Sequence, residues 1–157
     1  GRERLDRLIL QIPVIGDMMK KIYISRFSST LAILLDSGVD LLTSLAIVED
    51  VVGNQVFARI ITDARMEVRE GVSFSEPLSR AEEFPGMVAQ MISVGEETGS
   101  IGNMLYKVSD FYDREVESSV DAAISLIEPV MIVALAVVVG FVAVSIVTPM
   151  FDMYQQF

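Results

Sequence analysis

The chain has 157 residues, enough for one domain with a hydrophobic core and an appended segment. Its formal net charge of −10 leaves no basic surface to displace counterions from nucleic acid, so no nucleic-acid partner is expected. Because it contains no Cys and no His, disulfides, zinc sites and the usual nucleophilic constellations are excluded, and we predict no catalytic, cofactor-binding or metal-binding residue.

Residues 1–16 are predicted to form a basic juxtamembrane segment. The chain begins with Gly, and no signal-peptide pattern follows, so we interpret the start as the cut end of a longer chain. Residues 1–26 carry six basic and three acidic side chains, which suits an anionic membrane leaflet. The basic residues are Arg2, Arg4, Arg7, Lys20, Lys21 and Arg26.

Residues 17–128 are predicted to form an all-α, antiparallel helical bundle. Apolar residues recur at helical spacing and no long segment alternates with period two. Pro13 and Gly16 interrupt the chain before the bundle, and Asp17 is expected to cap the helix that follows. The positions predicted to be buried are Leu31, Leu35, Leu41, Leu45, Leu78, Ile92 and Leu105.

Glycines mark the expected helix ends. The segments GVDLLTSL, GVSFSEPL and GSIGNML each begin with a glycine stop, followed by Asp or Ser as a helix cap and by apolar residues one turn apart. The chain is thus expected to fold back three times, each time through a glycine helix end followed by a capped helix start. A further helix is expected to start at Asn54, after Gly53, and another to have Pro85 in its first turn.

The turn GEETGSI places two carboxylates, Glu96 and Glu97, where one helix ends and the next begins at Ser100. The new helix N-terminus favours nearby negative charge, so a tight corner explains the pair without any ligand. The alternative is that one acid contacts a partner protein or a cation. Gly95 costs about 1 kcal/mol inside a helix unless another backbone comes close, which makes it a helix-packing candidate.

The segment from Val130 to Val147 has no charged residue and is long enough to cross most of a bilayer, so residues 129–149 are predicted to be a transmembrane helix. All Lys and Arg residues precede it, which places the bundle in the cytoplasm and the tail, residues 150–157, across the membrane. Pro129 is expected to kink the helix.

Glu128 lies at the predicted membrane boundary and is a candidate for partner binding. Within the span, the small residues Ala136, Gly140 and Ala143 recur at helical spacing and are candidates for close helix packing. Lipid-tolerant small residues would give the same pattern.

The stretches RFSSTLAILLDSGVDLLTSL, EGVSFSEPL, FPGMVAQMISVGEETGSIGNML and EPVMIVALAVVVG resemble the type II secretion system F family of inner-membrane platform proteins. The resemblance covers nearly the whole chain and corresponds to the family's second cytoplasmic domain and last transmembrane helix. It implies a non-enzymatic scaffold of a type IV pilus or type II secretion machine in the bacterial inner membrane. The implied partners are a hexameric assembly ATPase, pilin or pseudopilin subunits, other inner-membrane assembly proteins, further copies of the protein and membrane lipid.

Two other functions fit the sequence less well. An intramembrane aspartyl peptidase needs two carboxylates that share a proton, but the span contains no acid, and Glu128 and Asp152 lie beyond its opposite ends. A channel or transporter fragment would have Glu128 as its candidate ion ligand, although a single helix makes no pathway.

Overall fold

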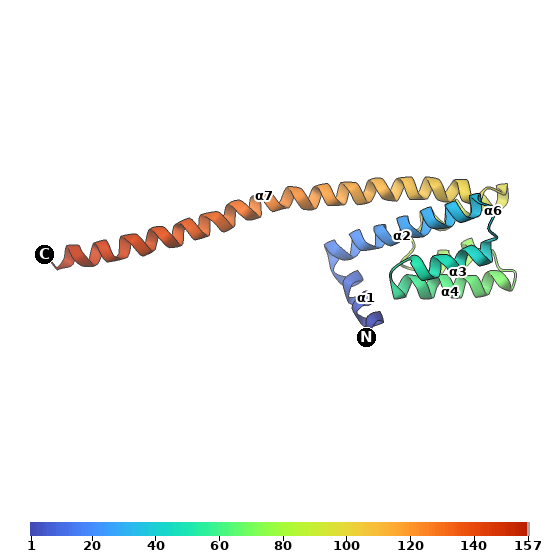
Figure 1. Ribbon diagram of the computed structural model, residues 1–157, viewed down its shortest axis with the longest axis horizontal. Coiled ribbons are helices and arrows are strands. Elements are labelled where there is room, and N and C mark those ends of the chain that lie inside the picture. The colour runs from blue at the N-terminus through green and yellow to red at the C-terminus, as the bar shows by residue number, and fades with distance from the viewer. Residues whose placement is uncertain (157) are drawn as a thin grey trace. The chain divides into compact units, whose positions relative to one another are not determined.

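The computed structural model describes residues 1–156, which contain seven helices and no strand (Figure 1). This confirms the predicted all-α class. The helices are α1 (Arg2–Gln11), α2 (Pro13–Asp36), α3 (Leu41–Val51), α4 (Gln55–Arg69), α5 (Ser75–Arg80), α6 (Gly86–Thr98) and α7 (Ile101–Gln155). The chain divides into two compact units, Gly1–Glu117 and Ser118–Phe157, and α7 contributes to both. Phe157, the last residue of the predicted tail, lies outside the described residues.

The glycine stops are confirmed. Gly38, Gly53, Gly71 and Gly99 all have positive φ, a conformation that costs little only without a Cβ atom. After three of them the next backbone N–H bonds the carbonyl five residues back. The donor–acceptor pairs are Val39 to Leu34, Val72 to Glu67 and Ser100 to Gly95, at 3.0, 3.0 and 2.8 Å. Gly38 and Gly71 complete a Schellman turn, because their own N–H groups bond the carbonyls of Leu35 and Val68. At Gly99 the variant differs, since the N–H groups of Gly99 and Ser100 both bond the carbonyl of Gly95.

Two of the expected helix caps form. Asp40 accepts a hydrogen bond from the backbone N–H of Thr43 at 3.0 Å, and Asn54 accepts from the N–H groups of Val56 and Phe57. The Ser of GVSFSEPL, Ser73, does not cap, because α5 starts two residues later with Phe74 at its N-cap position.

Three local expectations were wrong. Asp17 caps no helix, because Pro13 already starts α2; Asp17 lies within the helix and pairs with Lys21 at 3.1 Å. Pro85 occupies the N-cap position of α6, one residue before the first turn. Gly16 does not interrupt the chain but is buried inside α2, where a Cβ atom would lie 2.3 Å from the carbonyl oxygen of Leu10. Its role is to let the end of α1 approach α2.

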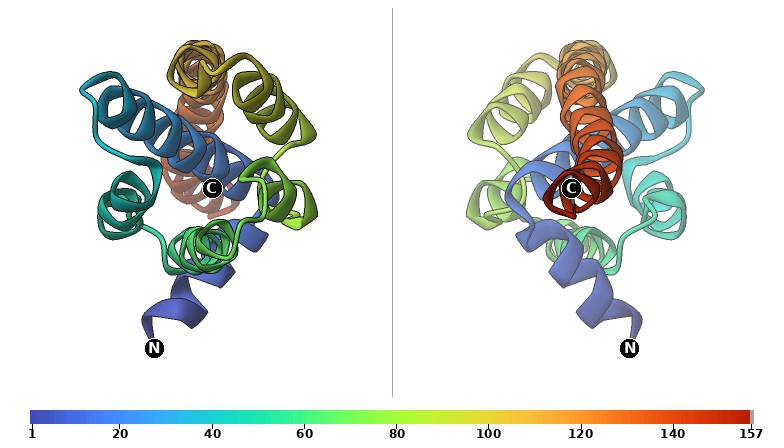
Figure 2. Two further views of the ribbon diagram at one scale, coloured as in Figure 1. Left: turned by 90° about the vertical axis from the view of Figure 1, so that its right-hand side faces the viewer. Right: turned by 90° about the vertical axis from the view of Figure 1, so that its left-hand side faces the viewer.

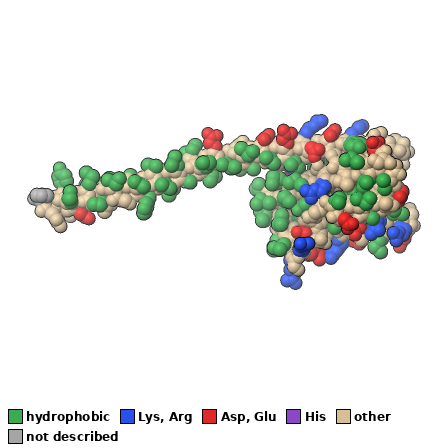
Figure 3. All heavy atoms as spheres, viewed as in Figure 1, with side chains coloured by type: hydrophobic (Ala, Val, Ile, Leu, Met, Phe, Trp, Pro, Cys, Tyr) green, Lys and Arg blue, Asp and Glu red, His purple; other side chains and the backbone are tan. Residues whose placement is uncertain are grey.

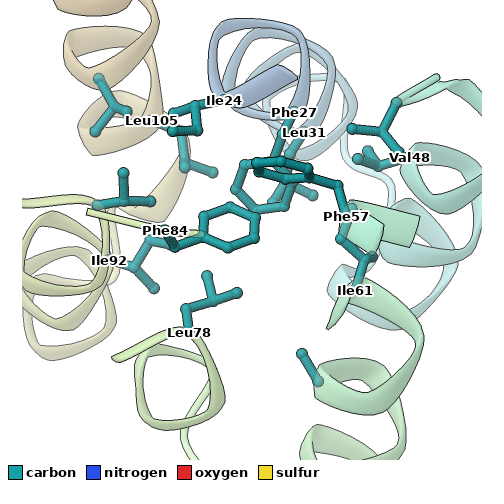
Figure 4. Packing of buried hydrophobic residues seen from close by; sticks show 14 of the residues in the cluster. Ile24, Phe27, Leu31, Val48, Phe57, Ile61, Leu78, Phe84, Ile92 and Leu105 are labelled. Carbon is teal, nitrogen blue, oxygen red and sulfur yellow. The ribbon is translucent and has the colours of Figure 1, made fainter. Parts of the chain in front are cut away.

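The core of the first unit is built around phenylalanines. The ring of Phe27 lies 5.1 Å from that of Phe84, and the ring of Phe57 lies 5.2 Å from that of Phe84, centroid to centroid (Figure 4). The ring of Phe74 lies 6.4 Å from that of Phe27. Such tilted and edge-on pairs add to the hydrophobic gain of burial. In the end-on views, α2, α3, α4 and α6 surround this interior together with the first turns of α7 (Figure 2).

Most of the predicted core positions are confirmed. Five are fully buried: Leu31, Leu45, Leu78, Ile92 and Leu105. Leu35 and Leu41 were predicted to be buried but are only partly so, because they flank the turn at Gly38, in the last turn of α2 and the first of α3, and pack on the margin of the core.

Helix α1 is held on the bundle by its acidic residues. Glu3 pairs with Arg59 of α4 at 2.6 Å, and Asp6 accepts a hydrogen bond from the backbone N–H of Gln55 at 2.8 Å. The second bond satisfies one of the N–H groups that the start of α4 leaves without a helical partner. Both contacts fix α1 relative to α4.

The second unit consists of the rest of α7, and its apolar residues are exposed (Figure 3). Helix α7 is long and apolar enough to cross a membrane, and none of its most apolar window is buried in the protein. A core helix of a soluble protein would be covered by other elements. The helix is therefore a candidate membrane span.

The stability of the first unit is expected to fall in alkali. A hydrogen bond to Asp17 and a second contact with Glu115 raise the pKa of Lys21 above 10.5, and burial raises the pKa of Tyr112 above 10.0. The folded protein thus keeps protons that the unfolded chain releases. The two groups therefore make their full contribution to the free energy of unfolding below about pH 10, and that contribution decreases at higher pH. Urea unfolding at about pH 9 and pH 11 should show this decrease, and Tyr112→Phe should make it smaller. An equal decrease in the variant would contradict the role of Tyr112.

Candidate functional site

The turn predicted from GEETGSI forms a tight corner between α6 and α7 in the first unit. Gly95 is buried in the last turns of α6, and a Cβ atom on it would lie 2.6 Å from the Cα atom of Ile101. The prediction that another backbone approaches this glycine is consistent with that distance. The corner borders a pocket of about 370 Å³. Its lining residues are Leu35, Asp36, Gly95, Glu96, Gly99, Ser100, Ile101, Gly102 and Asn103.

The two acids of the turn differ in environment. Glu96 is half-buried, lines the pocket and accepts a hydrogen bond from the backbone N–H of Ser75 at 2.8 Å. It thus satisfies an N–H group at the start of α5, a role that sequence reasoning missed because the partner lies 21 residues away. Glu97 is exposed. Of the pair, only Glu97 presents its carboxylate mainly to the surroundings, and it remains the better candidate for partner binding.

Gly95→Ala is expected to destabilise the first unit by about 1–3 kcal/mol. The new methyl group meets backbone atoms of Ile101, which cannot rotate away as a side chain would, and this outweighs the helix propensity gained from Ala. Gly86→Ala in the same helix is the matched control, because nothing lies within 4 Å of its Cβ position. Urea unfolding followed by circular dichroism measures both, and equal stabilities would contradict the close approach at the corner.

In the second unit, Glu128 lies in an apolar groove along α7. The groove is lined by Ile124, Ile127, Glu128, Met131, Ile132, Ala134, Leu135 and Val138. Glu128 is the acidic residue of this set, directly before Pro129, which lies inside the helix and donates no hydrogen bond. The helix continues through Pro129, and a kink there stays a prediction.

The small residues predicted for helix packing also lie on α7. Ala136, Gly140 and Ala143 are all exposed, and apart from the neighbouring backbone of α7 itself no atom of the described chain lies within 4 Å of a Cβ built on Gly140. No contact within residues 1–156 therefore accounts for this glycine. Its packing against another helix stays a prediction.

No group of three or more His, Cys, Asp or Glu residues in the described part of the chain is placed to hold a metal ion. The candidate residues at the corner belong to the first unit, and Glu128 with the small residues belongs to the second. They are thus two separate candidate regions and not one site.

Together, a bundle of short helices joined by glycine turns and one helix apolar enough to cross a bilayer define a helical protein with a candidate membrane anchor. The sequence profile of the family described as "Type II secretion system (T2SS), protein F" matches residues 27–149. The chain belongs to this family.

Individual relatives come from two machines. The chain is 41% identical over 152 residues to "Type IV pilus assembly protein PilC" of Thermus thermophilus, covering 96% of this chain and 37% of the relative. It is 37% identical to the protein of the same name from Myxococcus xanthus, covering 98% of this chain and 37% of the relative. It is 36% identical to "Type II secretion system protein F" of Aeromonas hydrophila, covering 97% and 39%. The chain thus spans less than half the length of these relatives.

Proposed function

We propose that this chain is part of a non-enzymatic inner-membrane platform of a type IV pilus or type II secretion machine. The platform would couple a cytoplasmic assembly ATPase to the insertion of pilin or pseudopilin subunits into a fibre. The observation that carries the proposal is the continuity of α7 in a member of this family. Helical residues run from Ile101 to Gln155 without a Gly/Ser linker that would uncouple bundle from span.

We assign four functional segments as part of this proposal. Residues 1–16 are the basic juxtamembrane segment, 17–128 the cytoplasmic bundle, 129–149 the span in the bacterial inner membrane and 150–157 a short periplasmic or extracytoplasmic tail. The support for the orientation is the distribution of charge, since every Lys and Arg precedes the span.

Each candidate region is assigned one kind of partner. Glu97, exposed at the α6–α7 corner, is proposed to contact the assembly ATPase or another cytoplasmic component. Glu128, the acid in the apolar groove, is proposed to meet a polar or cationic group of an incoming pilin or of a neighbouring subunit. The face with Gly140 is proposed to pack against a membrane helix of another copy or of another inner-membrane assembly protein.

Glu97→Gln is expected to leave stability within about 0.5 kcal/mol of the parent while reducing fibre assembly or secretion, because an exposed carboxylate contributes little to folding. Glu96→Gln is the matched control, since the amide oxygen can still accept the hydrogen bond from Ser75. Thermal melts and counts of surface pili, or the amount of secreted substrate, measure the two effects. Normal assembly by Glu97→Gln would remove the partner assignment.

Site-specific photocrosslinking in cells that assemble the machine tests the function itself. A photoreactive residue at Glu97 should capture a cytoplasmic ATPase, and one at Leu135, in the groove with Glu128, should capture pilin or a neighbouring membrane subunit. A probe at Met66, exposed on α4, serves as the control. Capture of neither class of partner by the first two probes, in cells shown to assemble fibres, would overturn the platform proposal.

A further inference from the structure

Helix α1 has two chemically different faces. One carries Glu3 and Asp6, which the contacts with Arg59 and Gln55 hold on α4. At 100° per residue, Leu5 and Leu8 fall together on the opposite side of α1. Ile12 follows directly after the helix, at its C-cap, and the three residues are 61%, 57% and 46% exposed. Both acidic residues of α1 thus contact α4, and the apolar residues of α1 face away from α4.

The apolar face has a positive border. On the same helical projection, Arg2 lies on one side of the face and Arg4 on the other. Within the described residues, neither arginine forms an ion pair, whereas Arg7 pairs weakly with Glu3 at 3.9 Å. An apolar stripe with cationic edges is the arrangement of helices that lie in a membrane interface.

The start of α2 extends this surface. Val14 is 75% exposed and Ile15 is 48% exposed, directly after the break between α1 and α2. The space-filling view shows hydrophobic side chains gathered over this end of the first unit, with basic side chains beside them (Figure 3). The patch therefore continues from α1 to α2. Isolated apolar residues are common on protein surfaces, but a continuous patch indicates a binding surface.

We propose that this surface, formed by Leu5, Leu8, Ile12, Val14 and Ile15 with Arg2 and Arg4 at its edges, binds the face of an anionic lipid bilayer. This inference rests on the juxtamembrane assignment of residues 1–16 proposed above and names the surface that would make the contact. The contact is separate from the proposed span of α7 and requires neither the ATPase nor pilin. With the candidate span of α7 inserted, the bilayer is present at a high effective concentration near α1. Even a weak contact between α1 and lipid would then be occupied.

Charge favours lipid over a second copy of the chain as the occupant. Two copies that met through this patch would bring the arginine edges of both together, and like charges repel. A leaflet offers acyl chains to the leucines and phosphate oxygens to the guanidinium groups at the same time. Because Glu3 and Asp6 tie α1 to α4, membrane binding by α1 would fix the position of the whole bundle on the bilayer.

The absence of cysteine makes the test direct, because single cysteines can be placed for spin labelling. The full chain carrying Leu8→Cys is labelled and reconstituted into vesicles of phosphatidylcholine, with and without about one third phosphatidylglycerol. Oxygen partitions into lipid, whereas a nickel complex stays in water. The rates at which the spin label collides with each of them report whether the label lies in lipid or in water. Met66→Cys on α4 is the control for an exposed residue of the bundle, and Val139→Cys reports the span of α7 separately.

In vesicles with phosphatidylglycerol, the Leu8 label should be accessible to oxygen and shielded from nickel, and the Met66 label should stay accessible to nickel. Arg2→Ala together with Arg4→Ala should lower the ratio of bound to free α1 by about 30-fold, taking ~1 kcal/mol per arginine and 1.4 kcal/mol per tenfold. Within the described residues neither arginine forms an ion pair, so circular dichroism should be unchanged.

Two results would overturn the inference. In the first, the Leu8 label is accessible to the nickel complex while the Val139 label lies in lipid. This result would contradict the α1 contact and leave the proposed span intact. A Leu8 label shielded equally in both vesicle types, with dipolar coupling between labels of two chains, would assign the patch to a second copy.

Discussion

Leu45→Ala is expected to lower the free energy of unfolding of the first unit by about 2–5 kcal/mol. Leu45 is fully buried in α3 and belongs to the cluster that contains Phe27 and Phe57. Removing its three outer carbon atoms loses their transfer free energy and leaves a cavity that a well-packed core fills only in part. A loss of this size is a large share of the stability of a small domain.

Urea unfolding of the full chain in nanodiscs, followed by circular dichroism, measures the change, because the span contributes a constant helical signal. Ile33→Ala on α2 is the matched control, since Ile33 is 54% exposed and its truncation should cost less than about 1 kcal/mol. A change below about 0.5 kcal/mol for Leu45→Ala would show that the site is not part of the packed core.

Glu128→Gln and Pro129→Ala are each expected to abolish or severely reduce fibre assembly while the protein still inserts and folds. Gln keeps the shape of Glu128 but removes its charge, so the polar or cationic partner proposed above loses its counter-charge. Ala at position 129 restores the N–H that Pro lacks and gives the carbonyl of Ser125 a hydrogen-bond partner, which stiffens the helix and would remove the predicted kink.

Asp121→Asn is the matched control, because it removes a carboxylate from an exposed position of the same helix outside the predicted span. Pilus counts or secreted substrate report function, and membrane fractionation with circular dichroism reports insertion and folding. If both variants assemble fibres at the parent rate, Glu128 and Pro129 only mark the end of the span, and the coupling role is wrong.

The features that could be predicted from sequence are those set by short segments. A glycine with positive φ at Gly38, Gly71 or Gly99 is required by the local geometry of a helix end, and Asp40 and Asn54 cap helices through bonds to residues two or three positions away. Helical periodicity identified most of the core for the same reason. The all-α fold, the candidate span and the family thus followed from patterns within a few turns of chain.

The features that could not be predicted depend on which segments meet in space. Glu96 bonds Ser75 across a packing interface, and Gly16 is needed because the end of α1 folds back onto α2. The sequence predicts Asp17 as a cap only if Pro13 breaks the chain, whereas Pro13 is the first residue of α2. The roles of Glu97, Glu128 and Gly140 depend on other molecules, so neither the sequence nor one chain decides them.

The position of the last core residues along the chain has a consequence for biosynthesis. The interior of the first unit is complete only when Leu105, Val108 and Tyr112 of α7 have been added. At ~5–20 residues per second, the ribosome needs on the order of one to four seconds to pass from Tyr112 to Val130, where the apolar segment begins. Helical domains with mostly local contacts fold in microseconds to milliseconds. Once Tyr112 has left the ribosome, the bundle can therefore close long before translation has completed the candidate span.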